Sequence, residues 1–166
     1  IGTVGTGSMV TWVMREAVRM PDVAYEAVYS RSVQTGRALA DSFGVKKVYT
    51  ALGDMLADPE VDWVYVASPN SLHYEHTKAA LQAGKHVLCE KPFTPSRAQA
   101  EELAKLAEER DLMLLEGITT LSVPHFARIR DALEQIGPVR QVSCTFCQYS
   151  SRFHALQAGQ TPNVFN

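Results

Sequence analysis

The chain has 166 residues, of which 46% are hydrophobic and 20% are charged, a composition that favours a globular protein over a disordered, collagen-like or coiled-coil one. The formal net charge of −2 gives no electrostatic reason to expect a nucleic acid or an anionic membrane as a partner. No apolar run approaches the roughly 18 residues that a transmembrane helix needs, so we expect no membrane partner.

Predicted strands and helices alternate through the first part of the chain. Short apolar segments predict strands over residues 1–4, 23–29, 47–49, 61–67, 86–89 and 112–115. Apolar residues at helical spacing predict helices over residues 10–18, 35–43, 52–56, 75–83 and 97–110. This alternation implies right-handed crossovers and a doubly wound parallel sheet, so the predicted fold class is α/β. Ligands of such sheets bind at the carboxyl ends of the strands.

The pattern changes after Gly117. Ser122 is expected to cap a helix that begins at Pro124 and ends at Gly137. Residues 139–149 then alternate in polarity like an antiparallel strand.

Two domains follow from this change of pattern. We predict a first domain over residues 1–120 and the beginning of an incomplete second domain over residues 121–166. The sequence starts at Ile1 without Met and stops at Asn166 without a closing element. We therefore expect it to be a fragment of a longer protein.

The three cysteines are Cys89, Cys144 and Cys147. An odd, sparse set gives no disulfide framework and suits a reducing compartment, so we expect a cytoplasmic protein. Cys144 and Cys147 are three residues apart in a predicted strand, which points their side chains to opposite faces. The histidines show no metal-ligand spacing either, so we predict no metal site.

A glycine-rich turn joins the first predicted strand to the first predicted helix. In such a turn, Gly5 allows the tight bend and Gly7 lets the backbone approach a pyrophosphate, which the helix N-terminus at Ser8 and Met9 then stabilises. The third position of a dinucleotide-binding turn is usually Gly or Ala, and here it is Val10. The turn predicts a dinucleotide site, although a plain strand-to-helix turn also explains it.

The end of the second predicted strand indicates which dinucleotide is preferred. NAD sites usually place Asp or Glu there, to accept from the ribose 2′-hydroxyl. Ser30 and Arg31 occupy this position, and the nearest carboxylate, Glu26, lies inside the predicted strand. A guanidinium beside a hydroxyl suits a 2′-phosphate, so we expect NADP, with NAD as the other candidate.

The fourth and fifth predicted strands end in further candidate site residues. Ser68, Pro69 and Asn70 form a turn that fits beneath a ribose or nicotinamide. His73 is either a cofactor contact or a surface residue at the start of a helix.

Glu90 and Lys91 follow the fifth predicted strand. Beside a positively charged nicotinamide, Lys91 can exchange a proton with a substrate hydroxyl. A loop salt bridge is the alternative role for this lysine.

The order of these motifs is more specific than any one of them. GTG, SRS, VDWVYVASPNSLH and AGKHVLCEKP follow one another along the chain. Together they resemble the glucose–fructose oxidoreductase / inositol dehydrogenase (Gfo/Idh/MocA) family. The resemblance implies an N-terminal Rossmann domain that binds NAD(P), and a C-terminal α+β domain whose open sheet shapes the substrate pocket and builds a homo-oligomer.

The resemblance also implies roles for the matching residues. Lys91 would be the catalytic lysine, with hydride transferred between nicotinamide and a carbinol carbon of a small-molecule sugar, polyol or diol. The implied cofactor-binding residues are Gly5, Gly7, Ser8, Met9, Ser30, Arg31, Ser68, Pro69, Asn70, His73, Glu90 and Lys91. The family's second-domain acid/base residues have no match here, so we expect residues 1–166 alone to be inactive. Two alternatives stay open: the family's NAD-using glycosidase chemistry and a non-catalytic dinucleotide-binding protein.

Overall fold

The computed structural model describes residues 1–147, 149 and 153–159. Contacts divide the chain into two compact units, of which the first spans Ile1–Gly117 and the second begins at Ile118.

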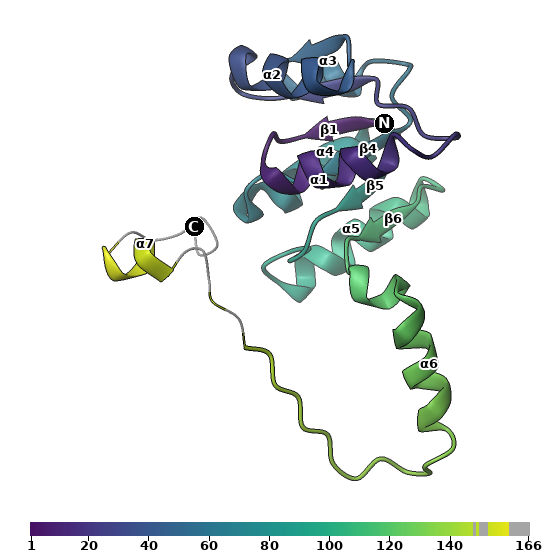
Figure 1. Ribbon diagram of the computed structural model, residues 1–166. Coiled ribbons are helices and arrows are strands. Elements are labelled where there is room, and N and C mark those ends of the chain that lie inside the picture. Colours follow the sequence, from purple (N-terminus) through teal and green to yellow (C-terminus); the bar gives the residue numbers. More distant parts are fainter. Residues whose placement is uncertain (148, 150–152, 160–166) are drawn as a thin grey trace. The chain divides into compact units, whose positions relative to one another are not determined.

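The first unit is built on a six-stranded sheet in which every paired strand is parallel to its neighbour. The strand order β3-β2-β1-β4-β5-β6 reverses direction between β1 and β4, which confirms the predicted doubly wound α/β fold. Figure 1 shows the strands side by side with helices around them. The strand bounds are β1 Gly2–Val4, β2 Ala27–Tyr29, β3 Lys47–Tyr49, β4 Trp63–Val66, β5 His86–Cys89 and β6 Leu114–Glu116.

Helices cover both faces of this sheet. Their bounds are α1 Ser8–Ala17, α2 Val33–Phe43, α3 Leu52–Leu56, α4 His73–Gln82 and α5 Arg97–Glu109, with a 3₁₀ turn, η1, at Asn70–Leu72. The residue types at the helix ends explain several of these bounds. Ser32 caps α2 by accepting from the Thr35 amide, and Gly44 ends that helix in the left-handed conformation with φ of 70°. Ser96 caps α5 in the same way by accepting from the Gln99 amide.

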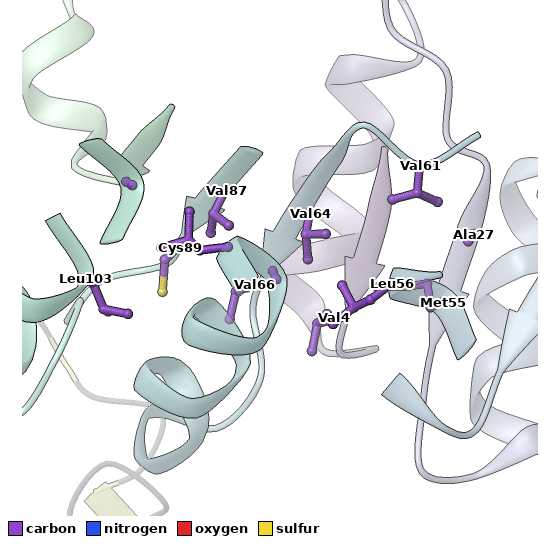
Figure 2. Packing of buried hydrophobic residues seen from close by; sticks show 13 residues of the cluster. Val4, Ala27, Met55, Leu56, Val61, Val64, Val66, Val87, Cys89 and Leu103 are labelled. Carbon is purple, nitrogen blue, oxygen red and sulfur yellow. The ribbon is translucent and has the colours of Figure 1, made fainter. Parts of the chain in front are cut away.

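The sheet has one buried apolar cluster on each face. On one face, Val64, Val66 and Val87 pack with residues of α3, α4 and α5, as Figure 2 shows for part of that cluster. On the other face, Val28 and Tyr65 pack with α1 and α2. Each large apolar side chain that is fully buried in such a cluster contributes about 1.5–3 kcal/mol to folding. Burial on both faces explains why the strands read as continuous apolar runs.

The predicted second strand was too long. The parallel pairing of β2 with β1 runs only from Ala27 to Tyr29, while residues 23–26 have no strand assignment. The pairing weakens before Ala27 to two bonds with Ile1, whose carbonyl accepts from the Glu26 amide at 2.9 Å and whose terminal amine donates to the Ala24 carbonyl at 2.6 Å. Glu26 therefore lies at the amino end of β2, away from the edge where ligands of such sheets bind.

The second unit contains η2 Thr119–Ser122, α6 Pro124–Leu133 and α7 Phe153–Gln157. The predicted helix at Pro124 is present, but its N-cap is Val123 and no side chain caps it. The strand expected over residues 139–149 is wrong for the described residues 139–147 and 149, which have no strand assignment. Alternation of side chains makes a strand only when a neighbouring strand supplies hydrogen-bond partners, and no described residue pairs with this segment. Across the described residues, no helix is both long and apolar enough to cross a membrane.

Candidate dinucleotide-binding site

The predicted site residues of the first unit all follow the carboxyl ends of strands in one sheet. The sheet order puts β1 between β2 and β4. The turns that follow these three strands therefore meet at one edge, at the point where the strand order reverses. In parallel α/β sheets this switch point is where dinucleotides bind.

Gly5 and Gly7 have different structural reasons to be glycine. Gly5 has φ of 114°, and a Cβ placed there would lie 2.6 Å from the backbone oxygen of Ala67. The close approach of the turn to the end of β4 therefore requires glycine. Gly7 is the N-cap of α1 with φ of −74°, and a Cβ there would meet no atom within 4 Å. The space over Gly7 is thus open at the end of α1, where backbone amides attract a phosphate.

The residues after Gly7 divide into an exposed pair and a buried one. Ser8 and Met9 begin α1 and are exposed. Val10 is fully buried and packs in the cluster that contains Met14 and Val28. The branched side chain at the third motif position is thus accommodated between α1 and the sheet, where the usual small residue would allow closer packing.

At the end of β2, Ser30 is engaged within the protein and Arg31 is exposed. The Ser30 hydroxyl lies 2.7 Å from the Thr35 hydroxyl and accepts from the Ser32 amide at 3.3 Å, so it fixes the turn into α2. Arg31 has no carboxylate within 4.0 Å among the described residues. Its uncompensated charge lies next to the N-terminus of α2, and both features favour an anion there.

The turn after β4 is held by His73. Both ring nitrogens of His73 face backbone oxygens, of Pro92 at 2.8 Å and of Ser68 at 2.9 Å. The His73 side chain is 1% exposed, so its described contacts link the turns after β4 and β5. A carbonyl only accepts, so a neutral ring satisfies one of these oxygens at a time and an imidazolium satisfies both. The cofactor contact expected for His73 stays a prediction.

Pro69 is the N-cap of η1 and Asn70 is its first residue. The Pro69 carbonyl accepts from the Leu72 amide at 2.8 Å, which closes the tight turn at the end of β4. Both side chains are partly exposed. They are therefore accessible from the edge of the sheet, as their predicted position near a ribose requires.

The end of β5 carries Glu90 and Lys91. The Tyr65 hydroxyl donates to Glu90 Oε1 at 2.8 Å, and a Cβ on Gly117 would lie 3.3 Å from the same oxygen. The Glu90 carboxylate is therefore held in a fixed place beneath the edge of the sheet. Lys91 is exposed and forms no salt bridge with a described residue, which leaves its ammonium group free to meet a ligand.

Tyr65 and His76 are residues of this edge that the sequence did not single out. Tyr65 stands inside an apolar strand and is 2% exposed, and burial raises the pKa of its hydroxyl. His76 Nδ1 lies 2.9 Å from the Ser68 hydroxyl. A tyrosine within a valine-rich strand is a sign of a buried polar partner. His76 carries no comparable signal.

These residues fit a dinucleotide and not a metal. The open space over Gly7, the free N-terminus of α1 and the uncompensated Arg31 match a chain of phosphates. No group of three or more His, Cys, Asp and Glu side chains in the described part of the chain is arranged to hold a metal ion. The fold and the site thus define a Rossmann domain of the dinucleotide-binding class.

Comparison with known proteins agrees with this class. The sequence model of the GFO_IDH_MocA family, described as an oxidoreductase family with an NAD-binding Rossmann fold, matches residues 1–118. The chain therefore belongs to the Gfo/Idh/MocA oxidoreductase family, as its motifs predicted.

Three relatives illustrate the likeness. The scyllo-inositol 2-dehydrogenase (NADP(+)) IolU of Bacillus subtilis is 35% identical over 98% of this chain and 49% of its own length. KijD10, a 3-ketoreductase from Actinomadura kijaniata crystallised with NADP and TDP-benzene, superposes with a TM-score of 0.75 at 34% identity over 81% of this chain and 41% of its own. GenD2 from gentamicin A biosynthesis, crystallised with NAD, superposes with a TM-score of 0.75 at 34% identity. The match covers 79% of this chain and 37% of the GenD2 chain. The chain spans about half the length of the curated relatives it matches.

Proposed function

We propose that this protein is an NADP-dependent oxidoreductase that transfers a hydride between nicotinamide and a carbinol carbon of a sugar, polyol or diol. One observation carries the proposal: the turn at Gly5 and Gly7, the exposed Arg31 and the exposed Lys91 follow strands of one parallel sheet at the same edge. The names of IolU and KijD10 support the substrate class, since one is an inositol dehydrogenase and the other a 3-ketoreductase.

Each residue of the edge has a role in this proposal. The amides at Gly7 and the start of α1 bind the pyrophosphate, and Arg31 binds the 2′-phosphate. The nicotinamide of the bound cofactor supplies the hydride acceptor or donor. Lys91 Nζ takes the proton of the substrate hydroxyl during oxidation and returns it during reduction. Tyr65 and Glu90 hold the end of β5 from which Lys91 projects.

The test of the catalytic role uses Lys91→Ala in the full-length protein, assayed on a panel of sugars, polyols and diols. We expect kcat to fall by about 10²–10⁴-fold, the usual contribution of a general acid or base. The Kd for NADPH, measured by quenching of protein fluorescence, should stay within about threefold, because a general base acts after binding. Lys105→Ala is the matched control, since that lysine is exposed on α5. An unchanged kcat in Lys91→Ala contradicts the assignment.

The cofactor preference is tested by the Kd values of NADPH and NADH. We expect NADPH to bind more tightly, and Arg31→Ala to reduce the difference by about 10- to 100-fold, since a charge-assisted bond contributes about 1.5–3 kcal/mol. Tighter binding of NADH by the unaltered protein contradicts the NADP preference. Turnover of a glycoside without net accumulation of NADPH would instead favour the glycosidase alternative.

A further inference from the structure

His76 lies between the turns that follow β2 and β4. Its ring packs edge-to-face against Tyr29, the last residue of β2, with the ring centroids 6.1 Å apart and an interplanar angle of 83°. Its Nδ1 lies 2.9 Å from the hydroxyl of Ser68, two residues beyond β4. The ring is therefore fixed from two strands at the edge where Arg31 leaves β2.

The contact with Ser68 accommodates both protonation states of His76. A serine hydroxyl can donate to a neutral imidazole nitrogen and can accept from an imidazolium N–H. The second ring nitrogen, Nε2, has no hydrogen-bond partner among the residues that the structure describes, and the side chain is half-buried. His76 can thus gain a proton in place, without moving its ring, and offer Nε2–H to a ligand.

The groups around His76 disfavour its protonation in the absence of an anion. Burial lowers the pKa of the imidazole, the charges of His73 and Arg31 lower it further, and Glu75 raises it. The groups that face the ring are Tyr29 and Arg31 from the β2 side, Ser68 from the β4 turn, and His73 and Glu75 from α4. A phosphate dianion placed beside Arg31 would raise the pKa of His76, because it attracts the imidazolium more strongly than Arg31 repels it.

We propose that His76 is a specificity-determining residue that joins Arg31 in binding the 2′-phosphate and makes NADP(H) binding take up a proton. This inference rests on the proposed function, since it deepens the 2′-phosphate role of the same edge. A dinucleotide without that phosphate brings no anion to His76, so its binding is not linked to this proton. The preference for NADPH over NADH therefore increases as the pH falls towards the titration range of histidine.

The experiment compares the Kd values of NADPH and NADH between pH 8.0 and 6.5 in the full-length protein and its His76→Asn variant. For the unaltered protein we expect the Kd for NADPH to decrease by about three- to tenfold over this range, below the limit of about 30-fold that one linked proton allows over about 1.5 pH units. The Kd for NADH should stay constant. In His76→Asn the decrease should disappear, because the amide retains a hydrogen-bond partner for Ser68 but does not titrate.

Two controls separate this linkage from other titrations. The 2′-phosphate itself gains a proton near pH 6, but loss of its charge weakens binding at low pH, which is the opposite direction. His86→Asn removes a histidine at the amino end of β5, on the side of the sheet opposite the carboxyl ends of the strands. This variant should leave the pH dependence of the Kd for NADPH intact. Calorimetry in two buffers of different ionisation enthalpy should show proton uptake with NADPH and none with NADH.

The outcomes distinguish this inference from the proposed function. An equal pH dependence in the unaltered protein and in His76→Asn, with NADPH still preferred, overturns the role of His76 alone. Tighter binding of NADH at every pH overturns the NADP preference and the inference with it. If His76→Asn does not fold, NMR titration of His76 in the unaltered protein decides. NADP should raise the pKa of His76 and NAD should not, and equal values with both contradict the linkage.

Discussion

The Tyr65 hydroxyl donates to Glu90 Oε1 at 2.8 Å and joins the buried interior of β4 to the residue before Lys91. Tyr65 is 2% exposed and belongs to the apolar cluster beneath α1 and α2. The bond therefore anchors the carboxyl end of β5 to the core.

Tyr65→Phe should destabilise the fold without disturbing its packing. The ring keeps its place, but Glu90 loses a hydrogen bond to its charged group, which contributes about 1.5–3 kcal/mol. We expect a decrease of that order in the free energy of unfolding in urea. Tyr74→Phe is the matched control, because its hydroxyl donates to Glu102 at the surface and should cost less than about 1 kcal/mol. Equal losses of unfolding free energy in the two variants would show that the bond to Glu90 stabilises the fold no more than a surface hydrogen bond does.

Gly5 and Gly7 should respond differently to alanine. Gly5→Ala forces a Cβ to 2.6 Å from the Ala67 oxygen at a φ of 114°, and such strain costs about 1–3 kcal/mol. Gly7→Ala fits the backbone, because φ is −74°. We expect Gly7→Ala to keep the melting temperature and to raise the Kd for NADPH by about tenfold or more, since the Cβ enters the space over the helix amides. A normal Kd in Gly7→Ala would place the pyrophosphate elsewhere.

Asp58 should make stability depend on pH in the acidic range. Its Oδ2 accepts from Lys47 at 2.7 Å and from Tyr49 at 2.9 Å. The bond from Lys47 is the main cause that lowers the pKa of Asp58 from 3.8 to about 2. Because the folded-state pKa is depressed, the stabilisation is complete above pH 3.8 and is lost as the pH falls through about 2.

The variant Asp58→Asn checks this sign. Its urea midpoint should lie below that of the unaltered protein at pH 7, and the difference should shrink between about pH 4 and pH 2. A difference that stays constant, or grows as the pH falls, contradicts the assignment.

Cys89 should resist alkylation in the native protein. It is fully buried in the cluster beneath α4 and α5, and burial raises the pKa of its thiol to about 12. Since the thiolate is the reactive form, iodoacetamide at pH 8 should leave Cys89 unmodified. Peptide mapping by mass spectrometry should detect its modification only after unfolding in urea. Labelling at equal rates in both conditions would show that β5 opens readily.

The sequence predicted the parts of the site that depend on local patterns. The glycines at 5 and 7, Ser30 and Arg31, and the pair Glu90 and Lys91 are candidates because each follows an apolar run at a strand end. In a parallel sheet these ends share one edge, so their convergence needs no knowledge of side-chain contacts. The strand expected over residues 139–149 failed for the complementary reason, because pairing depends on a partner that alternation does not reveal.

What the sequence by itself determined is the alternation of strands and helices, the family motifs and the residues that end each strand. Only the tertiary structure decided which of those side chains form hydrogen bonds or ion pairs within the protein and which do not. In it the Ser30 hydroxyl forms a hydrogen bond with Thr35, whereas Arg31 has no partner among the described residues. It also joins Tyr65 to Glu90 across 25 positions of sequence. Such contacts depend on the register of neighbouring strands and on the direction of each side chain, which a linear pattern of polarity does not record.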